Sequence, residues 1–127
     1  MLARETHRQA VAQALRHLRQ QVQWKPHKEA QHLTKRKRMG HLHGEATVDD
    51  YNALISVVVH EADSLLYHYP FSTRDYYAVS GQVEGVTWLV IFGIDGILET
   101  AFPPRDLDTY LTKRGFELLG RMGEIYP

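Results

Sequence analysis

The sequence contains no cysteine and no long apolar run, and these absences exclude several classes of protein. Without cysteine, the chain can form neither a disulfide framework nor a thiolate nucleophile. No apolar stretch approaches the ~20 residues that a membrane-spanning helix needs, and none follows the arginine-rich N-terminus as it would in a signal peptide. We therefore expect a cytoplasmic protein without a membrane contact, and the length favours a single domain over residues 1–127.

The formal net charge is zero, yet the charges are divided between two parts of the chain. Residues 1–43 hold ten lysines and arginines, two acids and six of the eight histidines. Residues 44–127 hold five basic and thirteen acidic residues. Two interpretations stay open: the basic part neutralises the acidic part within the fold, or it faces a polyanion.

Three helices are expected before the middle of the chain. Apolar residues at helical spacing predict an amphipathic helix over residues 3–23, with its arginines off the apolar stripe. A weaker helical pattern covers residues 27–38. Thr47 can cap a third helix over approximately residues 48–60, because acidic residues fill the first turn after it.

The rest of the chain predicts an antiparallel sheet of four strands. β-prone segments run over residues 65–69 and 76–80, and a hairpin closed by prolines follows over residues 86–104. A last helix, capped by Asp106, is expected over residues 106–120. The predicted fold class is therefore α+β, with N-terminal helices packed on a four-stranded antiparallel sheet and a C-terminal helix.

The hairpin is the most regular element in the sequence. Asp95-Gly96 between two apolar arms predicts a two-residue type I′ loop, in which both central residues have positive φ. Counting outward from that loop, Phe92 faces Glu99 and Ile91 faces Thr100. Thr100 is therefore a candidate for a working surface on the sheet, although threonine is also common in strands for its β-propensity alone.

The stretch from His27 to His43 combines histidines with permanent cations. His32 lies three and four residues before Lys35 and Arg36, so these side chains share a face of the predicted helix. Phosphodiester cleavage needs a base for the ribose 2′-proton, an acid for the leaving oxygen and a cation for charge on phosphorus. This chemistry requires no metal, so we expect no cofactor. A basic helix that carries a histidine is, however, more often a solvated surface.

A metal site is the alternative interpretation of the histidines. His41 and His43 stand two residues apart, and the other candidate ligands are His27, His32, His60 and His68. Zinc needs three or four converging ligands, and the neighbouring cations disfavour a dication. We therefore predict no metal site.

Basic and aromatic residues outside this set are candidates for binding RNA. They are Lys25, Lys28, Lys37, Arg38, Arg74 and Tyr77. A turn arginine can hold a phosphate and a tyrosine can stack on a base. The alternative for the last two is an exposed arginine and a core tyrosine.

Three short motifs occur in order along the chain. They are His-Leu-x-Lys-Arg from His32, Thr-Val-Asp-Asp-Tyr from Thr47, and Trp-Leu-Val-Ile-x(6)-Leu-Glu-Thr-Ala-Phe-Pro from Trp88. Together they resemble the barnase, EndoU, colicin and RelE-like (BECR) superfamily of ribonuclease domains. The resemblance covers residues 27–104, and it leaves 105–127 as an additional C-terminal helix and tail.

The resemblance implies a metal-independent ribonuclease of toxin, effector or prophage type, built from helices on a four-stranded antiparallel sheet. The catalytic set that it implies lies on the early helix and a late strand: His32, Lys35 or Arg36, and Thr100. Related sequences often place a histidine directly after the Lys-Arg pair, where this chain has Lys37, so His41 or His43 is the expected second proton carrier.

RNA is the partner expected from this resemblance, and an antitoxin or immunity protein is the protein partner that toxin-type members imply. The competing hypothesis is a non-catalytic module. Such a module would use the same basic helices to bind nucleic acid or an acidic protein.

Overall fold

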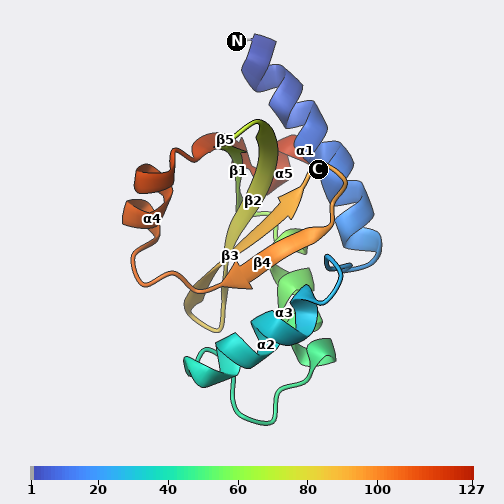
Figure 1. Ribbon diagram of the computed structural model, residues 1–127. Helices are drawn as coiled ribbons and strands as arrows, with labels where there is room; N and C mark the ends of the chain where they lie inside the picture. The colour runs from blue at the N-terminus through green and yellow to red at the C-terminus, as the bar shows by residue number, and fades with distance from the viewer. Residues whose placement is uncertain (1) are drawn as a thin grey trace.

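The computed structural model describes residues 2–127, which form helices around a single antiparallel sheet (Figure 1). Three helices come first: α1 (Leu2–Gln20), α2 (Lys28–Arg38) and α3 (Val48–His60). Four strands follow: β1 (Leu65–Phe71), β2 (Arg74–Val83), β3 (Val86–Gly93) and β4 (Leu98–Phe102). The chain ends with α4 (Leu107–Arg114), β5 (Glu117–Arg121) and α5 (Met122–Ile125). None of the described helices is long and apolar enough to cross a membrane.

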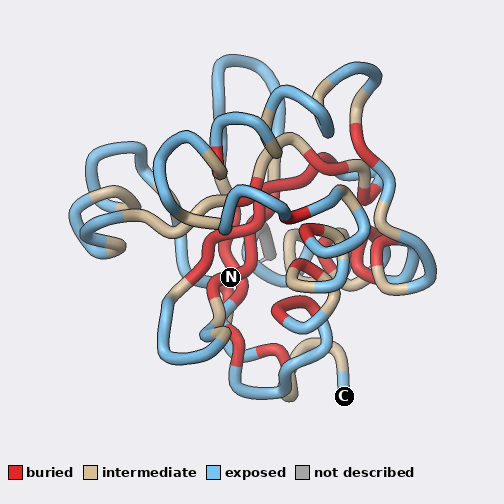
Figure 2. The backbone as a smooth tube through the Cα atoms, turned by 90° about the horizontal axis from the view of Figure 1, so that it is seen from below, coloured by how far each residue is buried: buried red, intermediate tan, exposed pale blue. Residues whose placement is uncertain are grey.

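The sheet has the strand order β4-β3-β2-β1-β5, and every pairing in it is antiparallel. Side chains from α1 and α3 pack on one face and form the main core with the inward-facing residues of the strands. On the opposite face, α4 covers a second, smaller cluster. Figure 2 shows the buried segments gathered in the interior, with exposed turns around them. The prediction of an α+β fold with N-terminal helices on an antiparallel sheet is confirmed, although the sheet has five strands rather than four.

The fifth strand replaces the second half of the helix predicted over residues 106–120. Asp106 caps α4 as expected, since its carboxylate accepts from the backbone N–H of Thr109 at 3.2 Å. The helix stops at Gly115, whose φ of 72° suits the residue after a helix C-terminus. β5 then pairs with the free edge of β1. The prediction failed because the pairing partner lies some fifty positions earlier, beyond the reach of local pattern.

The hairpin between β3 and β4 differs from its prediction in two respects. Its loop has three residues, with Gly93 N–H donating to the Ile97 carbonyl at 3.0 Å, and only Gly96 has positive φ. This is a type I turn followed by a left-handed glycine, not the expected type I′ turn. A bulge also places Phe92 opposite Leu98, so the predicted Phe92–Glu99 pair is wrong.

The bulge decides which way the end of β4 faces. In a regular strand, Leu98 and Ala101 would point to opposite faces, because side chains alternate. With one extra residue between them, both enter the core beneath the helices. Thr100 pairs with Ile91, as predicted, and it lies on the face that carries the smaller cluster.

The N-terminal segment is bound to both edge strands. After α1 ends at Gln20, earlier than predicted, the chain runs beside β4, where Leu98 N–H donates to the Gln23 carbonyl at 2.8 Å. Lys25 forms a salt bridge with Glu99. At the other edge, the Arg4 guanidinium donates to the Leu119 carbonyl of β5 at 3.1 Å.

The third helix is fixed at its start and in its middle. Thr47 and Asp50 form a reciprocal capping box, as the acidic first turn led us to expect. Tyr51 is fully buried, and its hydroxyl donates to the Ala101 carbonyl of β4. Helix and sheet are therefore joined by a hydrogen bond close to Thr100.

Gly96 provides a test of how closely the hairpin approaches α1. A Cβ at Gly96 would lie 2.5 Å from the Ala14 carbonyl oxygen, whereas one at Gly85 would meet nothing within 4 Å. Both glycines have φ near 80°. We expect Gly85→Ala to cost about 1–2 kcal/mol through backbone strain alone, and Gly96→Ala to cost about 3 kcal/mol or more because α1 must also shift. Urea unfolding of the two variants measures the difference, and equal losses would contradict the close packing.

Candidate active site

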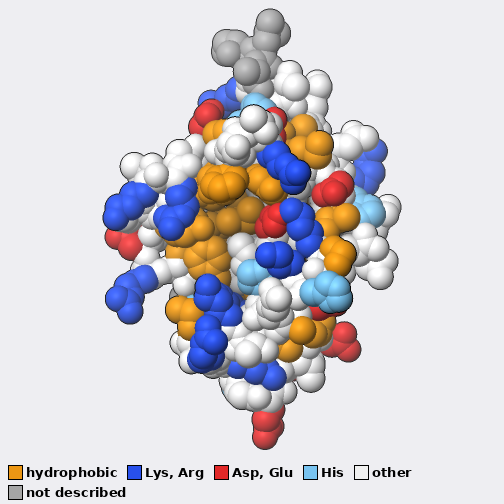
Figure 3. Space-filling model, viewed as in Figure 1, with side chains coloured by type: hydrophobic (Ala, Val, Ile, Leu, Met, Phe, Trp, Pro, Cys, Tyr) orange, Lys and Arg blue, Asp and Glu red, His pale blue; other side chains and the backbone are white. Residues whose placement is uncertain are grey.

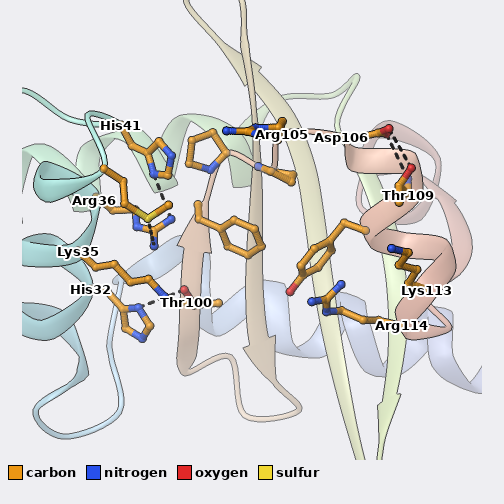
Figure 4. Close-up of a pocket in the computed structure, with 15 residues that line it drawn as sticks. His32, Lys35, Arg36, His41, Thr100, Arg105, Asp106, Thr109, Lys113 and Arg114 are labelled. Carbon is orange, nitrogen blue, oxygen red and sulfur yellow. Dashed lines mark hydrogen bonds between the residues drawn. The ribbon is translucent and has the colours of Figure 1, made fainter.

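A cleft of about 900 Å³ opens between α2 and α4, with the end of β4 between them (Figure 4). Three separate parts of the chain line it: α2 with the turn after it, β4 with the two prolines that follow, and α4. The lining side chains able to take part in chemistry are His32, Lys35, Arg36, His41, Thr100, Arg105, Asp106, Thr109, Lys113 and Arg114. Most of the predicted catalytic set therefore meets in one place.

His32 connects α2 to β4 across this cleft. Its Nδ1 lies 3.2 Å from Thr100 Oγ1, and its ring stacks on Trp24 with the centroids 5.6 Å apart. Burial lowers the pKa of the His32 imidazole, and the positive charges of Lys28 and Arg36 lower it further. His32 is therefore neutral at neutral pH and able to accept a proton.

Arg36 is a nearly buried cation, with only 4% of its surface exposed. Its guanidinium approaches His41 Nδ1 at 3.2 Å and Met39 Sδ at 3.9 Å, while Nε has no hydrogen-bond partner. Within residues 2–127, no carboxylate pairs with it. Buried charges are normally paired, so this one is suited to an anion that comes from outside the protein.

His41 lies beside Arg36, with its ring edge against Trp88 at 6.4 Å between centroids. A guanidinium can only donate, so Nδ1 of the neutral imidazole accepts and the proton is assigned to Nε2. Burial lowers the pKa of His41, and the charge of Arg36 adds to that effect. The cleft therefore holds two imidazoles with lowered pKa values on either side of a fixed cation.

Positive charge predominates around the cleft. Its basic side chains come from α2, from the segment after β4 and from α4: Lys35, Arg36, Arg105, Lys113 and Arg114. Asp106 is the one acid among the lining residues, and it is already engaged as the N-cap of α4. Figure 3 shows lysines and arginines around an apolar hollow on this face of the molecule. The cleft is thus suited to a polyanionic ligand that also has apolar parts.

Some of the predicted site residues lie outside the cleft. His43 is exposed on the loop after α2 and does not line the cleft, so of the two histidines only His41 lies in it. Lys37 and Arg38 follow Arg36 on α2 but are also absent from the lining. Hydrogen bonds from Thr47 lower the pKa of Asp50, and the nearby Lys37 adds a smaller effect in the same direction.

The other predicted RNA-binding residues are spread over the molecule. Lys25 is held by Glu99, Lys28 lies near His32, and Arg74 is exposed where β2 begins. Tyr77 is only 2% exposed, and its hydroxyl is 2.9 Å from Nδ1 of His7. Its assignment to RNA binding is therefore corrected: the alternation of β2 turns this ring into the core.

The α4 side of the cleft was missed by the sequence analysis. Lys113 and Arg114 lie in the last turn of α4. Cations commonly stabilise the C-terminus of a helix, so in the sequence these two residues indicate nothing beyond that role. Phe102 and Tyr110 also line the cleft. Only the packing of α4 beside β4 brings these residues opposite α2, and no local signal in the sequence reports that packing.

The histidines considered for a metal do not form one group. Within residues 2–127, the group with three metal-type donors close together is His7, His68 and Asp75, whose donor atoms lie within 4.8 Å of one another. His68 Nε2 is 2.7 Å from Asp75 Oδ1, and the two imidazoles stack at 3.6 Å with 20° between their planes. The lone pairs of the His7 and His68 nitrogens lie in the planes of their rings. Because the two planes are nearly parallel, these lone pairs do not point at one shared position between the rings. The arrangement therefore joins α1 to the sheet as a packed, hydrogen-bonded contact.

The whole chain was compared with protein families, curated proteins and solved structures. No family model, curated protein or solved structure matches this chain. Function must therefore be inferred from the chemistry that the cleft can perform.

Proposed function

We propose that this protein is a metal-independent endoribonuclease that cleaves RNA by attack of a ribose 2′-hydroxyl on the adjacent phosphorus. The observation that carries this proposal is Arg36, a nearly buried guanidinium without a carboxylate partner among residues 2–127, next to two imidazoles of lowered pKa. A phosphodiester would provide the missing anion. The resemblance of residues 27–104 to the BECR ribonucleases supports the same activity.

His32 acts as the general base in this scheme. If its Nδ1–H donates to Thr100 Oγ1, 3.2 Å away, the lone pair is on Nε2 and is free to take the 2′-proton. Thr100 thus fixes the tautomer and the ring orientation. The 2′-oxygen then forms a bond to phosphorus, while the bond from phosphorus to the 5′-oxygen breaks.

His41 supplies the proton that the leaving 5′-oxygen needs, so it must enter the reaction as an imidazolium. In the free protein Nδ1 of His41 accepts from the Arg36 guanidinium 3.2 Å away. In this scheme the guanidinium turns onto the bound phosphate and frees Nδ1 to take a proton, and the negative charge of the phosphate favours the imidazolium. Arg36 and Lys35 stabilise the charge that develops on the non-bridging oxygens. The products are a 2′,3′-cyclic phosphate and a 5′-hydroxyl end.

Product chemistry tests the proposal directly. Purified protein should convert an end-labelled RNA into fragments that carry 2′,3′-cyclic phosphate, and an RNA with 2′-deoxyribose at the cleavage positions should be bound and left intact. Binding of both RNAs without any cleavage would overturn the proposed activity. That result would support the non-catalytic module, which uses the same cations for binding alone.

The two histidines also predict how the rate depends on pH. One imidazole must be neutral and the other protonated, and the pKa of each in the free protein lies below its usual 6.5. We expect kcat/KM to be greatest below that pH. Above it, the protonated fraction of His41 falls by about tenfold per pH unit, and the rate falls with it. Initial rates on a dinucleotide substrate measure the profile, and a maximum near pH 8 would exclude His41 as the acid.

A further inference from the structure

Four side chains form a continuous series of contacts across the cleft. The Arg36 guanidinium on α2 lies 5.6 Å from the centroid of the Phe102 ring. Phe102 meets Tyr110 at 5.1 Å between centroids, with 67° between the planes. Arg114, in the last turn of α4, lies 3.8 Å over the centroid of Tyr110. We call the Phe102 and Tyr110 pair the aromatic floor of the cleft, and a guanidinium stands at each of its ends.

The aromatic floor belongs to the sheet face that α4 covers only in part. Phe102 and Tyr110 are partly exposed, and both line the cleft. Beyond them, Tyr69 and Phe116 stack at 4.1 Å with 6° between their planes. Figure 3 shows a hydrophobic hollow between basic side chains on the face of the molecule that it draws. Flat apolar surface and positive charge thus alternate within one opening.

This alternation matches one chemical class of ligand. A nucleotide chain alternates planar bases with phosphates, and aromatic rings interleaved with cations bind unpaired bases in many proteins. An acidic peptide would also use the cations, but its chain does not regularly alternate a charge with a large planar ring as a nucleotide chain does. In a duplex the base faces are already stacked on one another, so they cannot reach Phe102 or Tyr110. The surface therefore favours single-stranded RNA.

We infer that the aromatic floor is a base-binding subsite of the proposed ribonuclease, in which an unpaired base stacks on Tyr110 while its phosphate binds on the Arg36 side. In the free protein, the planar Arg114 guanidinium occupies the ring face that the base would take. Arg114 is exposed at the end of α4, so it can swing outward and then close over the base. This inference rests on the proposed function and adds to it a preference for unpaired RNA.

A binding experiment with three matched ligands tests the subsite. The ligands are a short fluorescent 2′-O-methyl RNA strand, the same strand with abasic positions, and its duplex; the methyl group prevents cleavage of the strand. Fluorescence anisotropy should show that the abasic strand and the duplex bind about 5- to 100-fold more weakly, the range in which base stacking on an aromatic ring contributes. The phosphates are the same in the two single strands, so the difference measures the bases.

Variants of the aromatic floor locate the effect. Tyr110→Leu keeps an apolar side chain but removes the flat ring, so it should weaken the strand with bases by about 5- to 100-fold and leave the abasic strand unchanged. Tyr110→Phe should bind like the wild type. Phe71→Leu is the matched control, because Phe71 is 57% exposed on β1 and does not line the cleft.

The outcomes separate the two proposals. Equal affinity for the strand with bases and the abasic strand, together with cleavage of RNA, would overturn the subsite and leave the ribonuclease in place. Tighter binding of the duplex would overturn the subsite as well. Binding that depends on the bases and on Tyr110, without cleavage, would support the subsite and overturn the catalytic proposal. No binding to any of the three ligands would overturn both.

Discussion

Replacing His32 with alanine should reduce RNA cleavage by about 10²- to 10⁴-fold, the contribution typical of a general base. The variant should still bind RNA, because the cations that line the cleft stay in place. It should also fold, since the ring is only partly buried and its loss removes one neutral hydrogen bond, to Thr100, and one stacking contact, with Trp24. Such a bond contributes about 1 kcal/mol to stability. Single-turnover cleavage at saturating protein measures the chemical step separately from binding.

His43→Ala is the matched control for this variant. His43 carries the same side chain but is exposed, and it does not line the cleft. Its removal should leave the cleavage rate within about twofold of the wild type, the scatter expected for a surface position. The control also detects a contaminating nuclease, which would give both preparations the same rate. Full activity in His32→Ala would show that the assignment of the base is wrong.

Replacing Arg36 with methionine should have opposite effects on activity and on stability. Cleavage should fall by about 10²- to 10³-fold, because the cation that holds the phosphorus charge is lost. The free energy of unfolding should stay the same or rise, because methionine removes a desolvated charge that has no carboxylate partner among residues 2–127. If Arg36 served only to stabilise the fold, its replacement would lower the free energy of unfolding instead.

The stability measurement should include sulfate as a probe. At low millimolar concentration, where its general stabilising effect on folded proteins is small, sulfate should raise the unfolding temperature of the wild type, because an anion that binds the native state stabilises it. It should have little effect on Arg36→Met at the same concentration. Arg38→Met is the control on the same helix, since Arg38 is exposed and does not line the cleft. A loss of about 3 kcal/mol or more in Arg36→Met would indicate an internal partner for the guanidinium and would contradict an anion site.

Local signals in the sequence predicted most of the helices and the central strands. The α3 cap at Thr47 and the α4 cap at Asp106 were both predicted from residues within one turn of helix. The hairpin was correct up to the Ile91–Thr100 pair, but the bulge beside it was missed. A bulge adds one residue to one strand without any compositional mark, so alternation alone cannot reveal it.

The candidate site was predictable on one side only. His32 and Arg36 lie within one helix turn, so their shared face follows from spacing, whereas their meeting with Thr100 was expected from the family resemblance. Tyr110 and Arg114 reach the same cleft through the packing of α4, which depends on a chain reversal at Gly115 and on the pairing of β5 with β1. Both depend on contacts between segments that are far apart in the sequence, so a pattern within one segment does not predict them.

The contacts of the N-terminal segment with both edge strands bear on association through strand edges. An unpaired strand edge is a template for the strands of other chains. Here the Gln23 carbonyl accepts from Leu98 N–H on β4, and Lys25 N–H donates to the Leu98 carbonyl. On β5, the Leu119 carbonyl accepts from the Arg4 guanidinium. The residues before α2 thus shield the sheet at both margins. A chain without the residues before α2 would expose more of the edges of β4 and β5, and pairing with other chains at these edges would compete with its folding.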